Sequence, residues 1–275
     1  MNEPVLSPGG SGRVLAVANQ KGGVGKTTTA INLGAALAAE GHSTLIIDLD
    51  PQGNASTGLN SHAGERNLTS YDALIGEASF NDVVHQTEVA NLFLAPGSVD
   101  LSGIDVEFVD TPDRAHRLKT LLDEPRQGHP FRDHFDYILV DCPPSLNLLT
   151  VNAMTAADAV IVPLQCEFFA LEGLSQLIAT IRRVQQGLNP ALKIEGIVLT
   201  MYDQRNRLSS QVAEDVRTNL GDIVYSTLIP RNVRLSEAPS HAMPALIYDP
   251  KCAGSRAYVE LASEVLRRSQ TNRAA

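Results

Sequence analysis

Short, continuously apolar runs alternate with longer amphipathic stretches along most of this chain. A run that is apolar at every position is typical of a strand buried on both faces, as in parallel sheets covered by helices. The pattern therefore predicts an α/β fold: one doubly wound, mainly parallel sheet flanked by helices. The expected strands are Val14–Ala18, Thr44–Ile47, Leu92–Ala95, Tyr137–Val140, Ala159–Val162, Ile194–Leu199 and Ile223–Ile229, and the expected helices are Thr28–Glu40, Thr111 to about Asp123, Leu171–Gln185, Ser209–Leu220 and Ser255–Arg268.

The two ends of the chain lack this alternation. Residues 1–12 are polar and rich in Gly, Ser and Pro, without the basic and apolar regions of a signal peptide, so we expect a disordered leader there. Residues 13–268 are expected to form a single domain, and residues 269–275 a flexible tail. No apolar run approaches the ~18 residues that a membrane span needs. Three widely spaced cysteines indicate neither a disulfide framework nor a metal knuckle, so a cytoplasmic protein is expected.

Charge is distributed unevenly along the chain. The formal net charge of −9 argues against a protein that coats nucleic acid over its whole surface. Residues 181–275 nevertheless carry 13 Lys and Arg against 9 Asp and Glu. On charge alone, a solvated surface explains this basic C-terminal third, and a local phosphate-binding face is the alternative.

A glycine-rich string lies directly between the first expected strand and the first expected helix. Glycines let the backbone take positive φ and turn its N–H groups toward phosphate oxygens, and the helix N-terminus adds further N–H groups. Lys26 is placed to reach the β- and γ-phosphates, the Thr27 hydroxyl to bind Mg²⁺, and Thr28 to contact the α-phosphate. The string is Lys21-Gly22-Gly23-Val24-Gly25-Lys26-Thr27-Thr28.

This string departs from the strict phosphate-loop pattern G-x-x-x-x-G-K-S/T in two ways. Gln20 stands where the pattern has its first glycine, and Lys21 is an additional lysine. Downstream, Asp48 and Asp141 each follow an expected strand directly. Because ligands of doubly wound folds lie beyond the carboxyl ends of the strands, both acids are expected to face the same crevice as the loop. An acid at a strand end can also cap a helix. Two such acids beside a phosphate loop indicate a metal-binding role instead.

Four strings in the chain together resemble one family of ATPases. They run in family order over residues 13 to about 265, nearly the whole chain, and the last string is the most diagnostic. They are Asn19-Gln20-Lys21-Gly22-Gly23-Val24-Gly25-Lys26-Thr27-Thr28-Thr29, Asp48-Leu49-Asp50-Pro51-Gln52-Gly53-Asn54, Asp141-Cys142-Pro143-Pro144-Ser145 and Ile229-Pro230-Arg231-Asn232-Val233-Arg234-Leu235-Ser236-Glu237-Ala238-Pro239-Ser240. In these strings the chain resembles the ParA/MinD group of deviant Walker P-loop ATPases, and within it the ParA/Soj partitioning proteins.

The resemblance implies ATP and Mg²⁺ as cofactors, slow ATP hydrolysis, and a homodimer that forms on ATP binding. Lys21 matches the family's signature lysine, which crosses the dimer interface to the partner's nucleotide and acts there as an arginine finger does. Asp50 matches the carboxylate that orients the attacking water. Asp48 is expected to support the Mg²⁺ shell, and Asp141 matches the acid that holds the ion through water.

The resemblance also implies where adenine and DNA bind. Pro230 and Asn232 sit where the family packs adenine. The family binds double-stranded DNA non-specifically as an ATP-bound dimer, through arginines that contact phosphates without reading bases. The implied partner is a centromere-binding protein of the ParB type, which stimulates hydrolysis, and the implied location is the nucleoid. The DNA-binding positions that match are Arg205 and Arg234, with Lys251 and Arg256 as neighbours.

Two other functions of related ATPases compete with this interpretation. A MinD-like membrane-surface ATPase ends in a basic amphipathic helix with large apolar residues, whereas the tail from Arg267 to Ala275 is basic without an apolar face. An iron–sulfur protein needs cysteines paired across a dimer axis or in a C-x-x-C, which Cys142, Cys166 and Cys252 do not match. The sequence therefore favours DNA partitioning without a membrane partner, and the membrane-surface ATPase is the alternative.

Overall fold

An eight-stranded, mainly parallel sheet forms the centre of the molecule. The computed structural model describes residues 12–60, 68–167 and 170–274, and within these the strand order is β10-β9-β8-β1-β7-β2-β4-β3. Neighbouring strands run parallel except β3, which pairs antiparallel with β4 at one edge. The strands are β1 (Arg13–Val17), β2 (Thr44–Asp48), β3 (His85–Gln86), β4 (Leu92–Ala95), β7 (Tyr137–Asp141), β8 (Ala159–Gln165), β9 (Lys193–Tyr202) and β10 (Val224–Pro230), beside a separate pair of β5 (Pro125–Arg126) and β6 (His129–Pro130).

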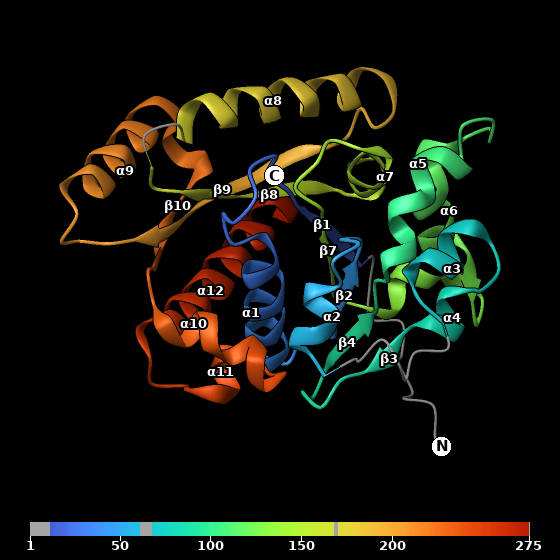
Figure 1. Ribbon diagram of the computed structural model, residues 1–275, viewed down its shortest axis with the longest axis horizontal. Helices are drawn as coiled ribbons and strands as arrows, with labels where there is room; N and C mark the ends of the chain where they lie inside the picture. The colour runs from blue at the N-terminus through green and yellow to red at the C-terminus, as the bar shows by residue number, and fades with distance from the viewer. Residues whose placement is uncertain (1–11, 61–67, 168–169, 275) are drawn as a thin grey trace.

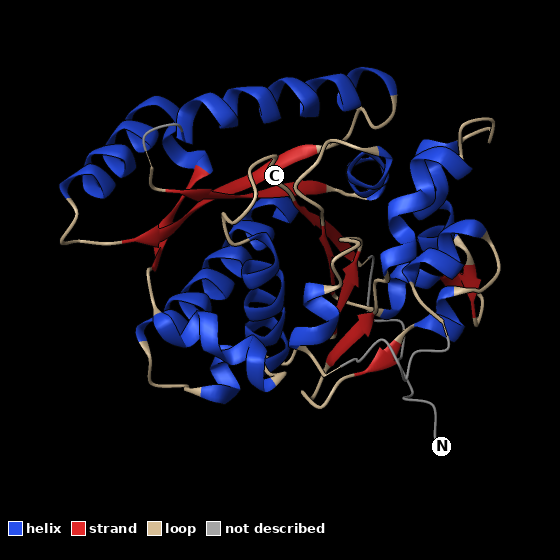
Figure 2. Ribbon diagram, viewed as in Figure 1, coloured by secondary structure: helices blue, strands red, loops and turns tan. Residues whose placement is uncertain are grey.

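Successive residues of the central strand enter opposite cores. Val14 and Ala16 of β1 pack in the core on one face of the sheet, whereas Leu15 packs in the core on the other face. This two-sided burial is why the strand is apolar at every position, and it confirms the predicted doubly wound sheet. Figure 1 and Figure 2 show the sheet between two helical layers. Helices α1 (Lys26–Ala39) and α12 (Ala253–Ala274) cover the face that holds Leu15, and α7 (Leu148–Ala156), α8 (Ala170–Gly187) and α9 (Arg207–Leu220) cover the other.

Helix α1, which follows the phosphate loop, lies very close to the sheet. A Cβ atom added at Gly34 would lie only 2.9 Å from Cδ1 of Ile46 in β2, so a larger residue there would push the helix outward. Small buried residues such as Ala30 and Ala38 continue this close contact along the helix. The start of α1, and with it the phosphate loop, is thereby fixed against the ends of the central strands.

Two helix boundaries depart from the sequence pattern by more than two residues. Asp113 has φ of 56°, in the left-handed region, and a 3₁₀ turn at Arg114–His116 precedes α6 (Arg117–Asp123), so the expected helix start at Thr111 is wrong. Helix α12 continues to Ala274, beyond the expected end at Arg268. The short helices that the pattern did not predict are α2 (Asn54–Gly58), α3 (Ser70–Ile75), α4 (Phe80–Val83), α5 (Ile104–Glu107), α10 (Val233–Glu237) and α11 (Ala245–Tyr248).

The predicted leader falls almost wholly outside the described residues. Residues 1–11 are not among them, and Gly12 is held by its carbonyl oxygen, which accepts a hydrogen bond of 2.8 Å from Nη2 of Arg132. Across the described ranges, no helix combines the length and the apolar character that crossing a membrane requires.

Candidate nucleotide-binding site

The glycine-rich string forms a loop between β1 and α1, as its sequence predicts. Gly23 has φ of 75° and Gly25 has φ of 89°, a left-handed conformation that residues with a Cβ atom adopt only at a cost. The Thr200 hydroxyl of β9 donates a 2.8 Å hydrogen bond to the Val24 carbonyl oxygen, which ties the tip of the loop to the sheet. The loop is thus held in one shape, with the N-terminus of the 14-residue α1 behind it.

Lys26, the first residue of α1, is buried beneath this loop. Its side chain reaches back so that Nζ donates a 3.1 Å hydrogen bond to the Lys21 carbonyl oxygen. Burial lowers the pKa of Lys26, while the nearby Asp141, Cys142 and Asp50 oppose that shift. A buried ammonium group at a helix N-terminus, with N–H donors that are not used within the protein, can bind an anion such as a phosphate group.

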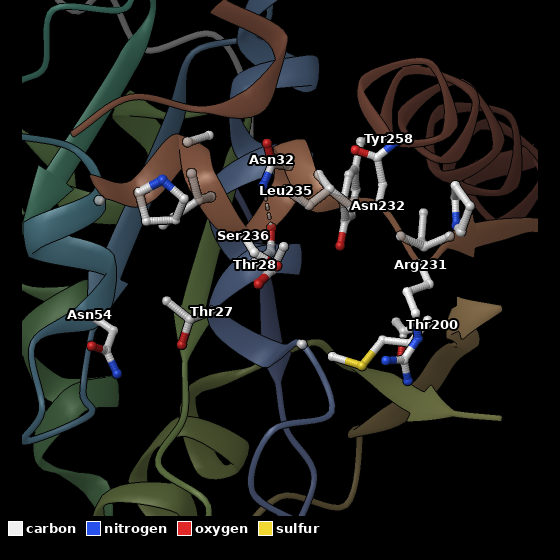
Figure 3. A pocket seen from close by; sticks show the side chains of 18 of the residues that line it. Thr27, Thr28, Asn32, Asn54, Thr200, Arg231, Asn232, Leu235, Ser236 and Tyr258 are labelled. Atoms are coloured by element: carbon white, nitrogen blue, oxygen red, sulfur yellow. Dashed lines mark hydrogen bonds between the residues drawn. The ribbon is translucent and has the colours of Figure 1, made fainter. Parts of the chain in front are cut away.

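Two adjoining cavities lie beside the loop. The larger, of about 530 Å³, extends from the loop along α10 to α12, and the smaller, of about 320 Å³, lies between the loop and the turn that follows β2. Figure 3 shows the larger cavity, where Thr28 at the start of α1 lies near Ser236 of the C-terminal region and Thr27 lies on the side of Asn54. Pro230 and Asn232, the two expected adenine contacts, line it. Asn54 and Leu235, from two of the family strings, also line it, as do Asn32, Thr200, Met201 and Tyr258, which no local sequence signal indicated.

Asp141 and Asp48 lie side by side at the ends of β7 and β2, where the sheet register pairs them. Asp141 is fully buried, and neither of its carboxylate oxygens makes a well-formed hydrogen bond. Burial raises the pKa of Asp141 well above its ordinary value, the Asp48 charge adds to that shift, and the Thr27 hydroxyl and Lys26 oppose it. Two unused buried carboxylate oxygens beside a hydroxyl fit a hard cation such as Mg²⁺, which prefers oxygen ligands.

Asp48 has a different environment from Asp141. Its Oδ1 accepts a 3.1 Å hydrogen bond from the Asp50 N–H, and its Oδ2 accepts bonds from the N–H and the hydroxyl of Ser56 at 2.9 and 2.6 Å. Burial raises the pKa of Asp48 to about 6, against these hydrogen bonds, which lower it. Both oxygens are therefore occupied by the protein itself, and the expected role of Asp48 at the metal stays a prediction.

Asp50 lies on the turn between β2 and α2 and lines the smaller cavity with Gln52. Its Oδ1 accepts a 3.0 Å hydrogen bond from the Gln52 N–H, which fixes the carboxylate on the turn. The smaller cavity also contains Lys26 and Thr27, so the structure brings Asp50 to the end of the site where the loop would hold phosphates.

Lys21 does not line either cavity. Its Nζ donates to Oε2 of Glu167 at 2.8 Å, and the two side chains are 44% and 46% exposed. The Lys21 N–H donates a 3.0 Å bond to the Asn19 side chain, which orients the residue at the outer edge of the loop. Lys21 is therefore turned away from the site of its own subunit, on a surface that another molecule can reach.

The four expected DNA-binding residues lie on exposed turns and helix ends of the C-terminal third. Arg234 is held by two acids, with Nη1 2.7 Å from Glu237 and Nε 3.5 Å from Asp249. The turn that follows Asp249 carries Lys251, and Arg256 lies in the first turns of α12, so Asp249 brings these residues near Arg234. Arg205 lies on the β9–α9 connection, and its exposed side chain pairs with Asp203.

Arg231 is an exposed cation between these two groups that sequence reasoning missed. Its N–H donates a 2.9 Å bond to the Tyr202 carbonyl oxygen, which places it beside the Arg205 turn, and two residues separate it from Arg234 along the chain. The available signal was a second arginine close to Arg234 in the same string. Arg231 itself lines the larger cavity, and its backbone bond to Tyr202 brings it close to the connection that carries Arg205.

The cysteines do not form a cluster. Burial raises the pKa of Cys142 above its ordinary range and that of Cys166 to about 11, so both behave as small buried residues. Among the residues that the structure describes, no group of three or more His, Cys, Asp or Glu side chains is arranged to hold a metal ion by itself. A magnesium ion at Asp141 would take most of its ligands from phosphates and water, as that ion commonly does.

A doubly wound sheet with a glycine loop, a buried lysine and strand-end acids defines a P-loop nucleotide-binding protein of the deviant Walker kind. A family model described as an AAA domain matches residues 12–194. The chromosome partitioning protein ParA of Caulobacter vibrioides (strain NA1000 / CB15N) is 60% identical over 262 residues, which cover 95% of this chain and 97% of that protein. The sporulation initiation inhibitor protein Soj of Bacillus subtilis (strain 168) is 50% identical, covering 92% and 98%. The chain belongs to the ParA/Soj family of chromosome-partitioning ATPases.

Solved structures support the same fold and nucleotide site. A Mycobacterium smegmatis protein described as cobyrinic acid a,c-diamide synthase, solved with ADP and magnesium, has a TM-score of 0.81 at 37% identity and covers 95% of this chain and 96% of its own. The cell division ATPase MinD of Pyrococcus furiosus has a TM-score of 0.76 at 28% identity, with 93% and 99% covered. The first of these relatives binds the two cofactors, a nucleotide and Mg²⁺, that the sequence predicts for this chain.

Proposed function

We propose that this protein is an ATPase that partitions DNA, and that ATP binding closes two copies into a dimer able to bind DNA. The observation that carries the proposal is the site itself. The glycine loop and buried Lys26 line two adjoining cavities that together are large enough for a nucleotide, and the buried Asp141 carboxylate lies close to Thr27 and Lys26. The partitioning role rests on the ParA and Soj relatives, which match the chain almost end to end.

Each residue at the phosphate end has one task in this proposal. Lys26 and the loop N–H groups bind the β- and γ-phosphates, and Thr28 contacts the α-phosphate. Asp141 and the Thr27 hydroxyl are the residues that would hold Mg²⁺, which when bound neutralises phosphate charge. Asp50 accepts a hydrogen bond from the attacking water and holds it toward the γ-phosphorus atom. Pro230 and Asn232 line the adenine end of the larger cavity.

Lys21 acts on the nucleotide of the partner subunit in this proposal. An ion pair between two half-exposed side chains, such as Lys21 and Glu167, stabilises a protein by at most about 1 kcal/mol. The triphosphate of a facing subunit carries more charge than one carboxylate, so it can attract Lys21 away from Glu167 when two copies close. Lys21 would then stabilise the charge that builds up on the γ-phosphoryl group during transfer.

The basic residues around Arg234 provide the DNA contact, and dimerisation doubles their number on one assembly. We infer that a ParB-type partner stimulates hydrolysis and so releases the dimer, and that the protein works in the cytoplasm at the nucleoid. Phosphate contacts of this kind are additive and salt-dependent, so DNA affinity rises steeply when two basic faces act together.

Arg234→Glu is expected to weaken ATP-dependent DNA binding at least about tenfold, because it replaces a phosphate contact with a repulsive charge. Retention of a mixed-sequence DNA duplex on immobilised protein, with ATP and Mg²⁺, measures the effect. Arg183→Glu, an exposed arginine on α8, makes the same charge change and should bind DNA like the wild type. Wild-type retention by Arg234→Glu, or an equal loss in Arg183→Glu, would contradict the proposed DNA-binding face.

A further inference from the structure

Ser56 joins three segments around the Asp48 carboxylate. It lies in α2, is fully buried, and donates its hydroxyl to Asp48 Oδ2 at 2.6 Å, while its N–H donates to the same oxygen at 2.9 Å. The Ser56 hydroxyl oxygen in turn accepts a 2.9 Å bond from the N–H of Gly97, just after β4. A single hydroxyl therefore connects the ends of β2 and β4 to α2, the helix that follows the turn carrying Asp50.

The same carboxylate fixes the Asp50 turn at both of its ends. At the start of the turn, Asp48 Oδ1 accepts the Asp50 N–H at 3.1 Å. At its end, the Asp50 carbonyl oxygen accepts the Gly53 N–H at 2.8 Å, and α2 begins directly afterwards and carries Ser56. Asp50 lies two residues beyond the end of β2, and the bridge between Asp48 and Ser56 links that strand end to α2 on the other side of the turn. The position of the Asp50 side chain over the smaller cavity therefore depends on this bridge as well as on β2.

We propose that Ser56 is a positioning residue for ATP hydrolysis, which holds Asp50 over the γ-phosphate end of the site through Asp48. The proposal rests on the ATPase function proposed above and adds a residue outside the nucleotide cavity to it. Hydrogen bonds to a buried carboxylate are stronger than those between neutral groups, so loss of the Ser56 hydroxyl loosens this bridge more than an ordinary serine bond. A displacement of Asp50 by a fraction of an ångström slows water attack without changing the phosphate-binding loop.

Gly97 gives independent support for a tightly built bridge. A Cβ atom added at Gly97 would lie 3.0 Å from the Asp48 carbonyl oxygen and 3.2 Å from Asp48 Oδ1. The loop after β4 therefore packs directly on the carboxylate that Ser56 holds. Gly97→Ala crowds Asp48 from the loop after β4 and provides a second variant that tests the same connection.

Steady-state ATP hydrolysis by Ser56→Ala, Ser56→Thr and Gly97→Ala tests the proposal. Ser56→Ala and Gly97→Ala are expected to lower kcat by about tenfold while KM for ATP stays within about twofold, and Ser56→Thr, which keeps the hydroxyl, is expected to restore kcat. Ser70→Ala is the matched control, because Ser70 is a fully buried serine whose hydroxyl bonds the Ala95 carbonyl oxygen rather than Asp48. That variant should hydrolyse ATP at the wild-type rate.

Hydrogen exchange of the Asp50 amide, measured without nucleotide, gives a readout that does not depend on activity. Ser56→Ala should speed this exchange at least about threefold, and Ser70→Ala should leave it unchanged. Wild-type kcat or unchanged Asp50 exchange in Ser56→Ala would overturn the proposal, as would equal losses of kcat in Ser56→Ala and Ser70→Ala. Absence of ATP hydrolysis in the wild-type protein, by contrast, would reject the proposed function itself.

Discussion

Lys26→Ala is expected to lose at least about a hundredfold in affinity for ATP. Lys26 is the only lysine lining the phosphate end of the described cavities, and its ammonium group is buried with donors to spare. Truncating one partner of a buried, hydrogen-bonded charge pair typically costs about 2–5 kcal/mol, and a hundredfold loss corresponds to about 2.7 kcal/mol. Calorimetric titration of the protein with ATP and Mg²⁺ measures the loss directly.

A matched control separates this effect from a general change in charge. Lys119, on α6, is an exposed lysine that pairs with Asp123 four residues later. Lys119→Ala removes the same charge at a distance from the loop, so its affinity for ATP should equal that of the wild type. If Lys26→Ala bound ATP within about threefold of the wild type, the phosphates would not lie in this loop.

Asp50→Ala is expected to slow ATP hydrolysis at least about a hundredfold while ATP binding is retained. The Asp50 carboxylate orients the water in the proposed mechanism, whereas the phosphates are held by the loop. In the proposed mechanism hydrolysis ends the life of the dimer, so the ATP-bound dimer of Asp50→Ala should accumulate. Phosphate release and gel filtration with ATP and Mg²⁺ measure the two effects on the same preparation.

Asp50→Asn distinguishes loss of the carboxylate from collapse of its turn. The asparagine carbonyl oxygen can still accept the hydrogen bond that Asp50 Oδ1 accepts from the Gln52 N–H, so the turn should keep its shape. Asp50→Asn is therefore expected to hydrolyse as slowly as Asp50→Ala. Near wild-type hydrolysis by either Asp50→Asn or Asp50→Ala would contradict the role assigned to Asp50. An Asp50→Ala protein that stays monomeric with ATP would contradict it as well.

The central strands and the phosphate loop could be predicted because their signals are local. A strand that is apolar at every position, such as β1, carries its two-sided burial in its own sequence, and the glycine loop follows it directly. Helix α7 was missed because Leu148–Ala156 is buried on nearly all sides and has no amphipathic period. The helix expected from Thr111 begins at Arg117 instead, because the left-handed turn at Asp113 outweighs the capping signal.

The contacts that shape the site could not be read in the same way. Thr200 bonds the loop from 176 residues away, and the Tyr258 hydroxyl lies 3.1 Å from that of Thr29 across 229 residues. Both contacts arise only when strands and helices from distant parts of the chain pack together. Tertiary structure likewise determines that Ser56 donates hydrogen bonds to the Asp48 carboxylate and that Lys21 pairs with Glu167. The residue types therefore indicated phosphate and metal binding, but they did not show that Asp48 and Lys21 already have hydrogen-bond or ion-pair partners within the protein.

Trans-complementation between two inactive variants tests most directly whether Lys21 serves the partner's nucleotide. Lys21→Ala and Asp50→Ala are each expected to hydrolyse ATP at a few per cent of the wild-type rate or less. In a mixed dimer, the Lys21→Ala subunit keeps its own Asp50 and receives Lys21 from its partner, so one of the two sites is complete.

An equimolar mixture of the two variants should therefore recover roughly a quarter of the wild-type rate, because half of the dimers are mixed and each has one complete site. Cross-linking of differently tagged subunits in the presence of ATP confirms that mixed dimers are present. Mixed dimers without recovered hydrolysis would show that Lys21 acts within its own subunit. That result would contradict the proposal that each subunit supplies Lys21 to the nucleotide of its partner.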